Sequence, residues 1–320
     1  MATNWIKYLD YFFVTRPILF FPGWSTLLAG FLVSTRETRW PWWHSETFFQ
    51  FHWWNSAIVV SMFAFMAAMG ASFILNQLQD VESDRKNRKL FLIGEEHIPL
   101  SNAIKESFFL IGLALILGSL LNWSTFFLLA FFILITGYLY NYPPFQYKNT
   151  AIMGLILNML MGWIAFALGW VLVQPLNLEF LRFSLPYLTL NTGLYFLTTI
   201  PDMDGDRSTG KHTFPVRFGI PTTILACEIS FFLSLILAWW NRDALILTID
   251  LLSLPWMIML AIRRDLTAVI KTVKMAIFFF SILICFKFPL YFVLVASIFF
   301  LTRYYYRERF QFDYPNFRGE

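Results

Sequence analysis

The sequence has little charge. Asp, Glu, Lys and Arg together make up 14% of its 320 residues, whereas 58% of the residues are hydrophobic and 20% are aromatic. So few polar groups cannot coat a water-soluble globule of this length. The composition therefore excludes an ordinary soluble protein and indicates that lipid surrounds most of the chain.

Period-two alternation and closely spaced cysteines are also missing. Without alternating apolar and polar residues a porin-type barrel is excluded, and the long apolar runs favour helices of about 20 residues that cross the bilayer. The two cysteines, Cys227 and Cys285, lie far apart in apolar runs. We expect both to be small buried residues, neither a disulfide nor metal ligands.

Apolar runs separated by short polar joints predict the fold class: an all-α, polytopic membrane helical bundle of about nine transmembrane helices. The last run contains Lys287 and Pro289 near its middle, so it is either one kinked helix or two short ones. The expected spans are residues 17–34, 56–76, 103–121, 123–141, 150–173, 183–200, 221–240, 244–262 and 275–302.

Lysine and arginine residues gather in alternate joints between these runs, which predicts an orientation. Such joints usually face the cytoplasm, and the N-terminus is then expected on the same side. An odd number of spans leaves the arginines that follow residue 302 on the opposite side, and a tenth span would remove this conflict. The basic joints carry Arg85, Lys86, Arg88 and Lys89, then Lys148, then Arg207, Lys211 and Arg217, and then Arg263, Arg264, Lys271 and Lys274.

No linker, low-complexity tract or soluble domain is visible, so residues 1–320 are expected to form a single transmembrane domain. Within it, helices one to four (about residues 1–148) and helices five to eight (about residues 149–265) each place an acidic motif after their second helix. This regularity predicts an internal repeat of a four-helix unit.

The first acidic motif follows the second predicted span and reads Asn76-x3-Asp80-x3-Asp84. Four residues turn a helix about 40° past a full revolution and raise it about 6 Å, so these three side chains line one face. The second motif follows the sixth span and places Asp202 and Asp206 four apart in the same way. Four spans separate the motifs, so both are expected at the cytoplasmic mouth, where they can face each other.

Opposed carboxylates repel each other unless cations lie between them, and carboxylate and amide oxygens are the ligands that Mg²⁺ prefers. Mg²⁺ typically bridges a few carboxylates to substrate phosphates, so the pair of motifs predicts a diphosphate substrate. The simpler alternative is that these residues are solvated helix ends, where charges are common. Two matching motifs, each followed by basic residues, favour the metal site.

With these motifs, the chain resembles the UbiA superfamily of intramembrane prenyltransferases, whose first motif is Asn-x3-Asp-x3-Asp and whose second is Asp-x3-Asp. Residues 205–219 have the spacing Gly-Asp-x3-Gly-x2-Thr-x3-Arg-x-Gly, which also fits the family pattern. In two departures, no Arg-Pro follows the first motif, and Lys148 is displaced from the Tyr-x3-Lys spacing of some members. The resemblance covers essentially the whole chain.

This resemblance implies transfer of an isoprenyl group from a polyprenyl diphosphate to an aromatic or other lipophilic acceptor, as in quinone, chlorophyll or related lipid biosynthesis. It implies Mg²⁺ as the cofactor, with two ions bridged by the substrate diphosphate. The expected partners are the polyprenyl diphosphate, the lipophilic acceptor and the lipid bilayer, with no nucleic acid.

The resemblance also implies roles for individual residues. Asn158, like Asn191, lies within an apolar span, so it either lines the acceptor cavity or bonds between helices. The expected catalytic residues are Asp80, Asp84, Asp202 and Asp206, and the expected metal ligands are these four and Asn76. The diphosphate is expected to contact Arg85, Lys148, Arg207 and Lys211. The expected pocket for the acceptor or the allylic cation contains Tyr140, Tyr142, Asn158 and Tyr195.

Two other functions combine membrane helices with aspartate motifs. A CDP-alcohol phosphotransferase needs an Ala-Arg run after its Asp-Gly pair, and neither motif provides one. A cation transporter needs ionisable residues near the middle of several spans, whereas the acidic residues here gather at one face. Both remain alternatives to prenyl transfer, the transporter being the weaker.

Overall fold

The computed structural model describes residues 4–39, 52, 55–86 and 91–315, and the side chains of residues 4, 82–86 and 91 lie outside this description. The described residues form helices and no strand, which confirms the all-α fold class. The first helices are η1 (Asn4–Leu9), α1 (Asp10–Phe13), η2 (Pro17–Leu19), α2 (Phe20–Ser34), α3 (Ser56–Lys86), α4 (Phe91–Gly94), α5 (Leu100–Leu121), α6 (Trp123–Ile133), η4 (Leu134–Leu139) and η5 (Tyr147–Asn149). They are followed by α7 (Ala151–Trp170), α8 (Leu178–Thr199), α9 (Met203–Ser208), α10 (Phe214–Phe218), α11 (Ile220–Asn241), α12 (Ala244–Arg263), α13 (Leu266–Lys287) and α14 (Pro289–Phe310).

Within the described part of the chain, eight helical segments are long and apolar enough to cross a membrane. The segment Trp123–Leu139 is apolar but shorter, and α8 is not among the eight. The multi-pass membrane fold is therefore confirmed, whereas the count of nine spans stays a prediction. The eight segments are Trp5–Ser34, Ser56–Val81, Leu100–Leu121, Ala151–Trp170, Ile220–Asn241, Ala244–Arg263, Leu266–Lys287 and Pro289–Phe310.

The last predicted span is divided between two helices. α13 ends at Lys287, α14 begins at Pro289, and Phe288 between them has a non-helical backbone with φ −125° and ψ 82°. Proline lacks the N–H that would continue a helix, but it fits the first position of a new one. The interpretation as one kinked helix is therefore wrong, and α13 begins at Leu266, earlier than the predicted run.

Five of the described helices begin at an Asn or Asp side chain that accepts hydrogen bonds from backbone N–H groups of the first turn. These N-cap residues are Asn55 for α3, Asn122 for α6, Asn177 for α8, Asp243 for α12 and Asp265 for α13. The first turn of a helix has no internal partners for its N–H groups, so such caps fix where each helix starts. The sharp joints between consecutive long helices follow from these caps.

Near the centre, α2 and α7 pack backbone against backbone. A Cβ atom on Gly30 would lie 2.0 Å from the carbonyl oxygen of Phe166, and one on Gly169 would lie 1.8 Å from that of Leu27. Only glycine permits such an approach, which is a common way for helices to associate in lipid. This contact fixes α7, which forms one wall of the cavity described below.

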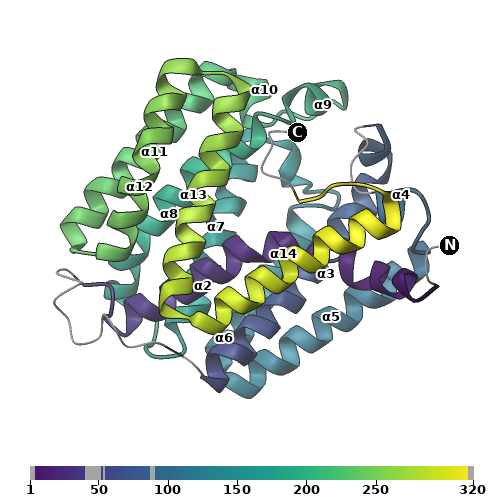
Figure 1. Ribbon diagram of the computed structural model, residues 1–320, viewed down its shortest axis with the longest axis horizontal. Coiled ribbons are helices and arrows are strands. Elements are labelled where there is room, and N and C mark those ends of the chain that lie inside the picture. Colours follow the sequence, from purple (N-terminus) through teal and green to yellow (C-terminus); the bar gives the residue numbers. More distant parts are fainter. Residues whose placement is uncertain (1–3, 40–51, 53–54, 87–90, 316–320) are drawn as a thin grey trace.

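Figure 1 shows α14 crossing the bundle obliquely from the end of α13 toward the N-terminal helices. There the Tyr305 hydroxyl donates to Asp10 Oδ1 at 2.7 Å, and Arg309 Nη2 lies 3.1 Å from Asp10 Oδ2. Asp10 is buried, so its charge needs these partners. The two ends of the chain are thereby joined beside the N-terminal turn that enters α2.

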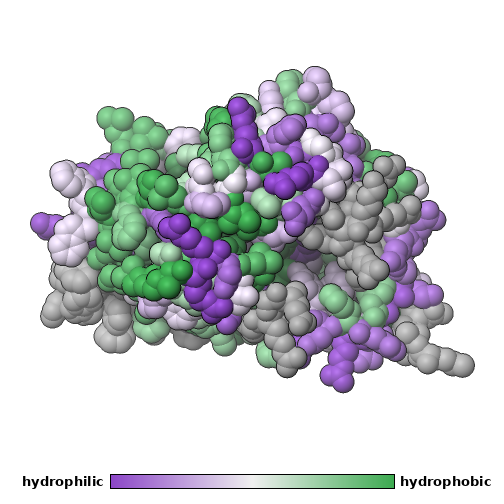
Figure 2. All heavy atoms as spheres, turned by 90° about the horizontal axis from the view of Figure 1, so that it is seen from above, coloured by the Kyte–Doolittle hydropathy of each residue, from purple (hydrophilic) through white to green (hydrophobic). Residues whose placement is uncertain are grey.

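Large apolar side chains remain exposed along several helices, as expected for a surface that lipid covers. Examples are Phe108 on α5, Phe127 on α6 and Phe232 on α11, each more than half exposed. Figure 2 shows hydrophilic side chains gathered mainly on one half of the viewed face and apolar side chains over much of the other. Cys227 and Cys285 are both buried and unbridged, as predicted.

Candidate active site

The first acidic motif lies on a helix, as its spacing predicts. α3 continues for ten residues beyond the predicted span and carries the motif on its C-terminal turns. Asn76 Nδ2 donates to Asp80 Oδ2 at 3.1 Å, so the two side chains lie on one face. Asp84 and Arg85 follow on the same helix, and their side chains lie outside the described residues.

The second motif is held in a short, well-tied turn. Asp202 precedes α9, and the Asp206 N–H donates to its carbonyl oxygen at 2.9 Å. The Thr213 hydroxyl donates to Asp206 Oδ2 at 3.0 Å. Gly210 has φ +75°, which lets the chain reverse so that the Lys211 N–H donates to the Asp206 carbonyl oxygen at 2.9 Å. The Asp206 backbone is therefore held on both sides, and its carboxylate is held by Thr213.

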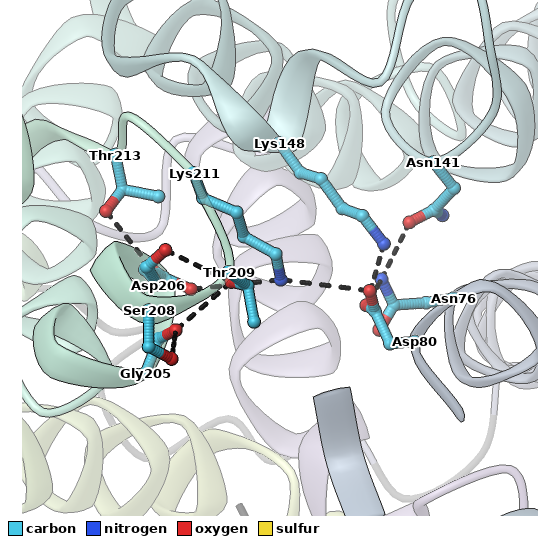
Figure 3. Close-up of polar contacts among 10 residues, drawn as sticks. All are labelled: Asn76, Asp80, Asn141, Lys148, Gly205, Asp206, Ser208, Thr209, Lys211 and Thr213. Atoms are coloured by element: carbon cyan, nitrogen blue, oxygen red, sulfur yellow. Dashed lines mark hydrogen bonds and ion pairs between the residues drawn. The ribbon is translucent and has the colours of Figure 1, made fainter. Parts of the chain in front are cut away.

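The two motifs converge on one ammonium group (Figure 3). Lys211 Nζ lies 3.8 Å from Asp80 Oδ1 and 3.8 Å from Asp206 Oδ1. Both carboxylates are 16% exposed, and Lys211 is 20% exposed. Two like charges on different helices are thus brought around a single cation, as the argument from repulsion requires.

A second lysine contacts the first motif. Lys148 Nζ lies 2.7 Å from Asp80 Oδ2, and its side chain is only 8% exposed. Its backbone N–H donates to the Tyr140 carbonyl oxygen at 3.2 Å, and Gln146 just before it is left-handed with φ 42°. This tight turn carries Lys148 into the site although its spacing departs from the family pattern.

A cavity of about 570 Å³ lies beneath these charges and has two unlike walls. One wall is largely apolar, with the rings of Phe65, Phe73 and Phe132 from α3 and α6. The other wall, from α7 and α8, carries the amides of Asn158 and Asn191. Both residues line the cavity, and Asn191 on α8 also packs against Gly162 on α7, where a Cβ atom would lie 2.0 Å from Asn191 Nδ2. The cavity can therefore hold both an apolar chain and a polar group.

The structure brings most of the expected site residues together. Arg207 is exposed and lies outside the cavity, and Tyr142 lies outside it and stacks on Tyr138. Among the residues whose side chains are described, no group of three or more His, Cys, Asp or Glu side chains forms a metal cluster. The expected site residues that line the cavity are Asn76, Asp80, Tyr140, Lys148, Asn158, Tyr195, Asp202, Asp206 and Lys211.

Several cavity residues carry no signal in the sequence. Ser72, Thr136 and Asn141 line the cavity between α3 and η4. The hydroxyl groups of Ser72 and Thr136 share a hydrogen bond, and the Asn141 amide donates to the Thr136 carbonyl oxygen. η4 is a π-helical turn, a rare conformation that often occurs at functional sites. Thr213 was detectable, because it is part of the run that follows the second motif.

Comparison with known proteins gives matches to one family. The family model described as "UbiA prenyltransferase family" matches residues 23–282. The 2-acyl-4-prenylphloroglucinol 6-prenyltransferase of Humulus lupulus is 28% identical over 173 residues, which cover 51% of this chain and 42% of that protein. The digeranylgeranylglyceryl phosphate synthase of Methanosphaera stadtmanae is 24% identical over 179 residues, which cover 56% of this chain and 64% of that protein. The chain therefore matches less than two thirds of the length of these curated relatives.

Solved structures share the fold at low identity. A UbiA homologue from Archaeoglobus fulgidus bound to GPP and Mg²⁺ superposes with a TM-score of 0.66 and 19% identity, covering 87% of this chain and 99% of that one. The same homologue bound to DMAPP and Mg²⁺ gives a TM-score of 0.64 with 18% identity over the same shares. The helical arrangement is thus that of these proteins over nearly their whole length.

Proposed function

Because the chain belongs to the UbiA prenyltransferase family, we propose that it carries out Mg²⁺-dependent transfer of an isoprenyl group from a polyprenyl diphosphate to a lipophilic acceptor. In this reaction the bond between the allylic carbon and a diphosphate oxygen breaks. The carbon then bonds to a nucleophilic atom of the acceptor, which loses a proton.

The observation that carries this proposal is the convergence of Asp80 and Asp206 at the mouth of a large cavity with both apolar and polar lining. Carboxylates on opposite walls provide cation ligands, and the cavity below them provides room for an isoprenyl chain. A diphosphate ester of a hydrocarbon has this same division into an anionic head and an apolar tail.

The donor set fits Mg²⁺. Carboxylate and amide oxygens from Asn76, Asp80, Asp202 and Asp206 are hard ligands, and a small number of them leaves positions for phosphate oxygens and water. We assign Asn76, Asp80 and Asp84 to one ion and Asp202 and Asp206 to the other, with the diphosphate bridging both. When bound, Mg²⁺ takes up negative charge that develops on the diphosphate.

The lysines hold the anionic head. Lys148 and Lys211 contact carboxylates whose charge the metal ions would neutralise, so both ammonium groups can turn to diphosphate oxygens. Charge-assisted hydrogen bonds of this kind strengthen as the leaving group gains charge. We keep Arg85 and Arg207 as weaker candidates at the rim.

The two unlike walls divide the cavity between the substrates. The rings of Phe65 and Phe132 suit the isoprenyl chain and exclude water from the breaking bond. Asn158 on the opposite wall, with Tyr140 and Tyr195 nearer the mouth, suits an acceptor that carries hydroxyl or carbonyl groups. We therefore favour a polar-headed acceptor such as a quinone precursor over a plain hydrocarbon, and we place the mouth on the cytoplasmic side.

Purified protein in detergent, labelled geranylgeranyl diphosphate and a panel of acceptors test this function. Transfer is expected with Mg²⁺ and is lost with EDTA. Asp206→Asn is expected to reduce transfer by about 100-fold or more because a metal ligand and its charge are lost. The matched control is Asp204→Asn, which changes the same charge on the same short helix at an exposed position.

Two results would contradict the proposed site: consumption of prenyl diphosphate that does not depend on Mg²⁺, or an equal loss of transfer activity in the Asp206 and Asp204 variants. Binding of the diphosphate without transfer to any acceptor in the panel would keep the site and reject the panel's acceptor classes.

A further inference from the structure

Two amide side chains at the site form a hydrogen-bonded pair between helices. Asn76 on α3 donates through Nδ2 to Asn141 Oδ1 at 2.7 Å (Figure 3). Asn141 in turn donates through Nδ2 to the Thr136 carbonyl oxygen at 2.6 Å. Asn141 is 1% exposed and follows directly on the π-helical turn η4. Neither amide is therefore free to rotate without losing a short hydrogen bond.

The Thr136 carbonyl oxygen determines which group donates and which accepts in the hydrogen bonds that link Thr136, Asn141 and Asn76. The Thr136 carbonyl oxygen is a backbone acceptor and cannot donate, so Asn141 must present its NH₂ group there. The Asn141 side-chain oxygen then faces Asn76, so Asn76 must donate through its NH₂ group. The same NH₂ group also reaches Asp80 Oδ2 at 3.1 Å, and a carboxylate is again only an acceptor. Two independent acceptors thus assign the same orientation to the Asn76 amide, which is otherwise ambiguous.

We propose that Asn141 is a positioning residue that fixes the Asn76 amide with its carbonyl oxygen toward the cavity, as a ligand for the Mg²⁺ bound by the first motif. This inference rests on the proposed function, in which Asn76 is a ligand. With the amide reversed, Asn76 would present N–H donors to a cation. The difference between the two orientations is therefore the difference between a ligand and a repulsive group.

The support for Asn141 is itself rigid. The hydroxyl groups of Ser72 on α3 and Thr136 on η4 share a short hydrogen bond, one helical turn before Asn76. Thr136 also donates to the Phe132 carbonyl oxygen at 2.7 Å. These bonds hold η4 against α3 at the height where the two amides meet. Groups behind a metal ligand that orient it typically change metal affinity by about 10- to 100-fold when removed.

The first experiment measures Mn²⁺ binding by EPR in the presence of geranyl diphosphate, with Mn²⁺ as a probe for Mg²⁺. Asn141→Leu keeps the branched shape and the number of heavy atoms and removes both hydrogen bonds, so the dissociation constant for Mn²⁺ is expected to rise by about tenfold or more. The matched control is Asn241→Leu. Asn241 is also a buried amide with two side-chain hydrogen bonds, to Arg182 at the far end of the bundle. It is expected to lower stability to a similar degree and to leave Mn²⁺ affinity unchanged.

The second experiment replaces the Asn76 amide with a group whose orientation does not affect metal binding. A carboxylate has two equivalent oxygens, so in an Asn76→Asp background the change Asn141→Leu is expected not to weaken Mn²⁺ binding. A purely structural role for Asn141 predicts the same tenfold weakening in both backgrounds. The double variant thus separates positioning from a general loss of packing.

Different results would overturn the proposed function and the positioning role of Asn141. If the wild-type protein binds no Mn²⁺ with geranyl diphosphate, the proposed function is wrong. If the wild-type protein binds Mn²⁺ and Asn141→Leu binds it equally well, only the positioning role is overturned. Equal weakening with and without Asn76→Asp also overturns it.

Discussion

Two lysine–carboxylate clusters lie at opposite ends of the bundle, and they differ in whether their side chains line the cavity. At the candidate site, Lys148 lies 2.7 Å from Asp80, and both side chains line the 570 Å³ cavity. At the other end, Lys287 lies 3.3 Å from Glu37, and these side chains are 1% and 9% exposed. The ion pairs are chemically alike, and their surroundings are not.

The far cluster is closed by further partners. His52 Nε2 lies 3.0 Å from Glu37 Oε1, and the Thr35 hydroxyl donates to the same oxygen at 2.8 Å. Burial by itself raises the pKa of Glu37, but the hydrogen bonds of His52 and Thr35 and the charges of His52 and Lys287 lower it overall. Glu37 therefore stays ionised, and its contribution to stability is lost only as the pH falls through that lowered pKa.

An ion pair enclosed by further partners is expected to stabilise the fold, whereas an ion pair that lines a cavity is expected to serve binding. Glu37 joins α2 to the junction of α13 and α14, so breaking its pair should cost stability. Asp80 and its two lysines line the cavity, so breaking their pairs should cost activity. The predictions below test this separation, from the largest expected effect to the smallest.

Removing the buried ammonium should have the largest effect. Lys287→Met leaves Glu37 buried without its lysine and is expected to lower the free energy of unfolding by about 3 kcal/mol or more. Unfolding in detergent, followed by circular dichroism, measures the loss. The double change Lys287→Met with Glu37→Gln should recover most of it, and a single change without effect would show that this pair is not structural.

Neutralising Asp80, which pairs with both Lys148 and Lys211, should reduce activity and leave stability nearly unchanged. Asp80→Asn is expected to reduce prenyl transfer by about 100-fold or more while changing the free energy of unfolding by about 1 kcal/mol or less, because cavity water can solvate the two lysines. Transfer rate and unfolding are measured on the same preparation. A loss of stability as large as that of Lys287→Met would erase the distinction between the two clusters.

Removing a cavity lysine should weaken substrate binding by a smaller factor. Lys148→Met is expected to raise KM for the prenyl diphosphate by about tenfold, which corresponds to the binding free energy lost with one charge-assisted hydrogen bond. Lys271→Met is the control, since Lys271 is exposed on α13 and does not line the cavity. Steady-state kinetics with varied diphosphate distinguish the two, and equal KM values would place Lys148 outside the binding site.

The smallest effect is expected for an exposed pair near the far cluster. Arg36 Nη2 lies 3.5 Å from Glu179 Oε2, with both side chains about half exposed. Glu179→Gln should change the free energy of unfolding by less than about 0.5 kcal/mol, because water screens the pair. The same unfolding assay applies, and a loss near that of Lys287→Met would mean that burial does not separate the two pairs.

Local patterns in the sequence were sufficient for most of the fold. Helix starts such as Leu100 for α5 and Ala244 for α12 lie within three residues of the predicted ones, because apolar runs and caps are local signals. The break at Phe288 needed more than the pattern. Lys287 within an apolar run pairs with Glu37, which lies 250 residues away in the chain.

Some residues of the candidate site could be predicted from the sequence, and others could not. Asp80 and Asp206 were detectable because their spacing repeats and because metal chemistry restricts the residue types that can serve. Asn141 was not detectable, because an Asn beside a turn has many roles and its contact with Asn76 spans 65 residues of sequence. A bond between distant residues leaves no periodicity to read.

The π-helical turn η4 has a further consequence for how this family member tolerates changes in length. A π-turn is equivalent to one extra residue within an α-helix. The wider turn already absorbs that residue, so deleting one residue between Leu134 and Leu139 would restore a regular helix and leave the residues after it on nearly the same faces. Deleting one residue from the regular helix α6 instead would rotate everything after it by about 100°. Asn141 would then leave the face that meets α3, although every residue of the two acidic motifs remained in place. The proposed metal site thus depends on where a change in length falls within a segment that contributes none of its proposed ligands.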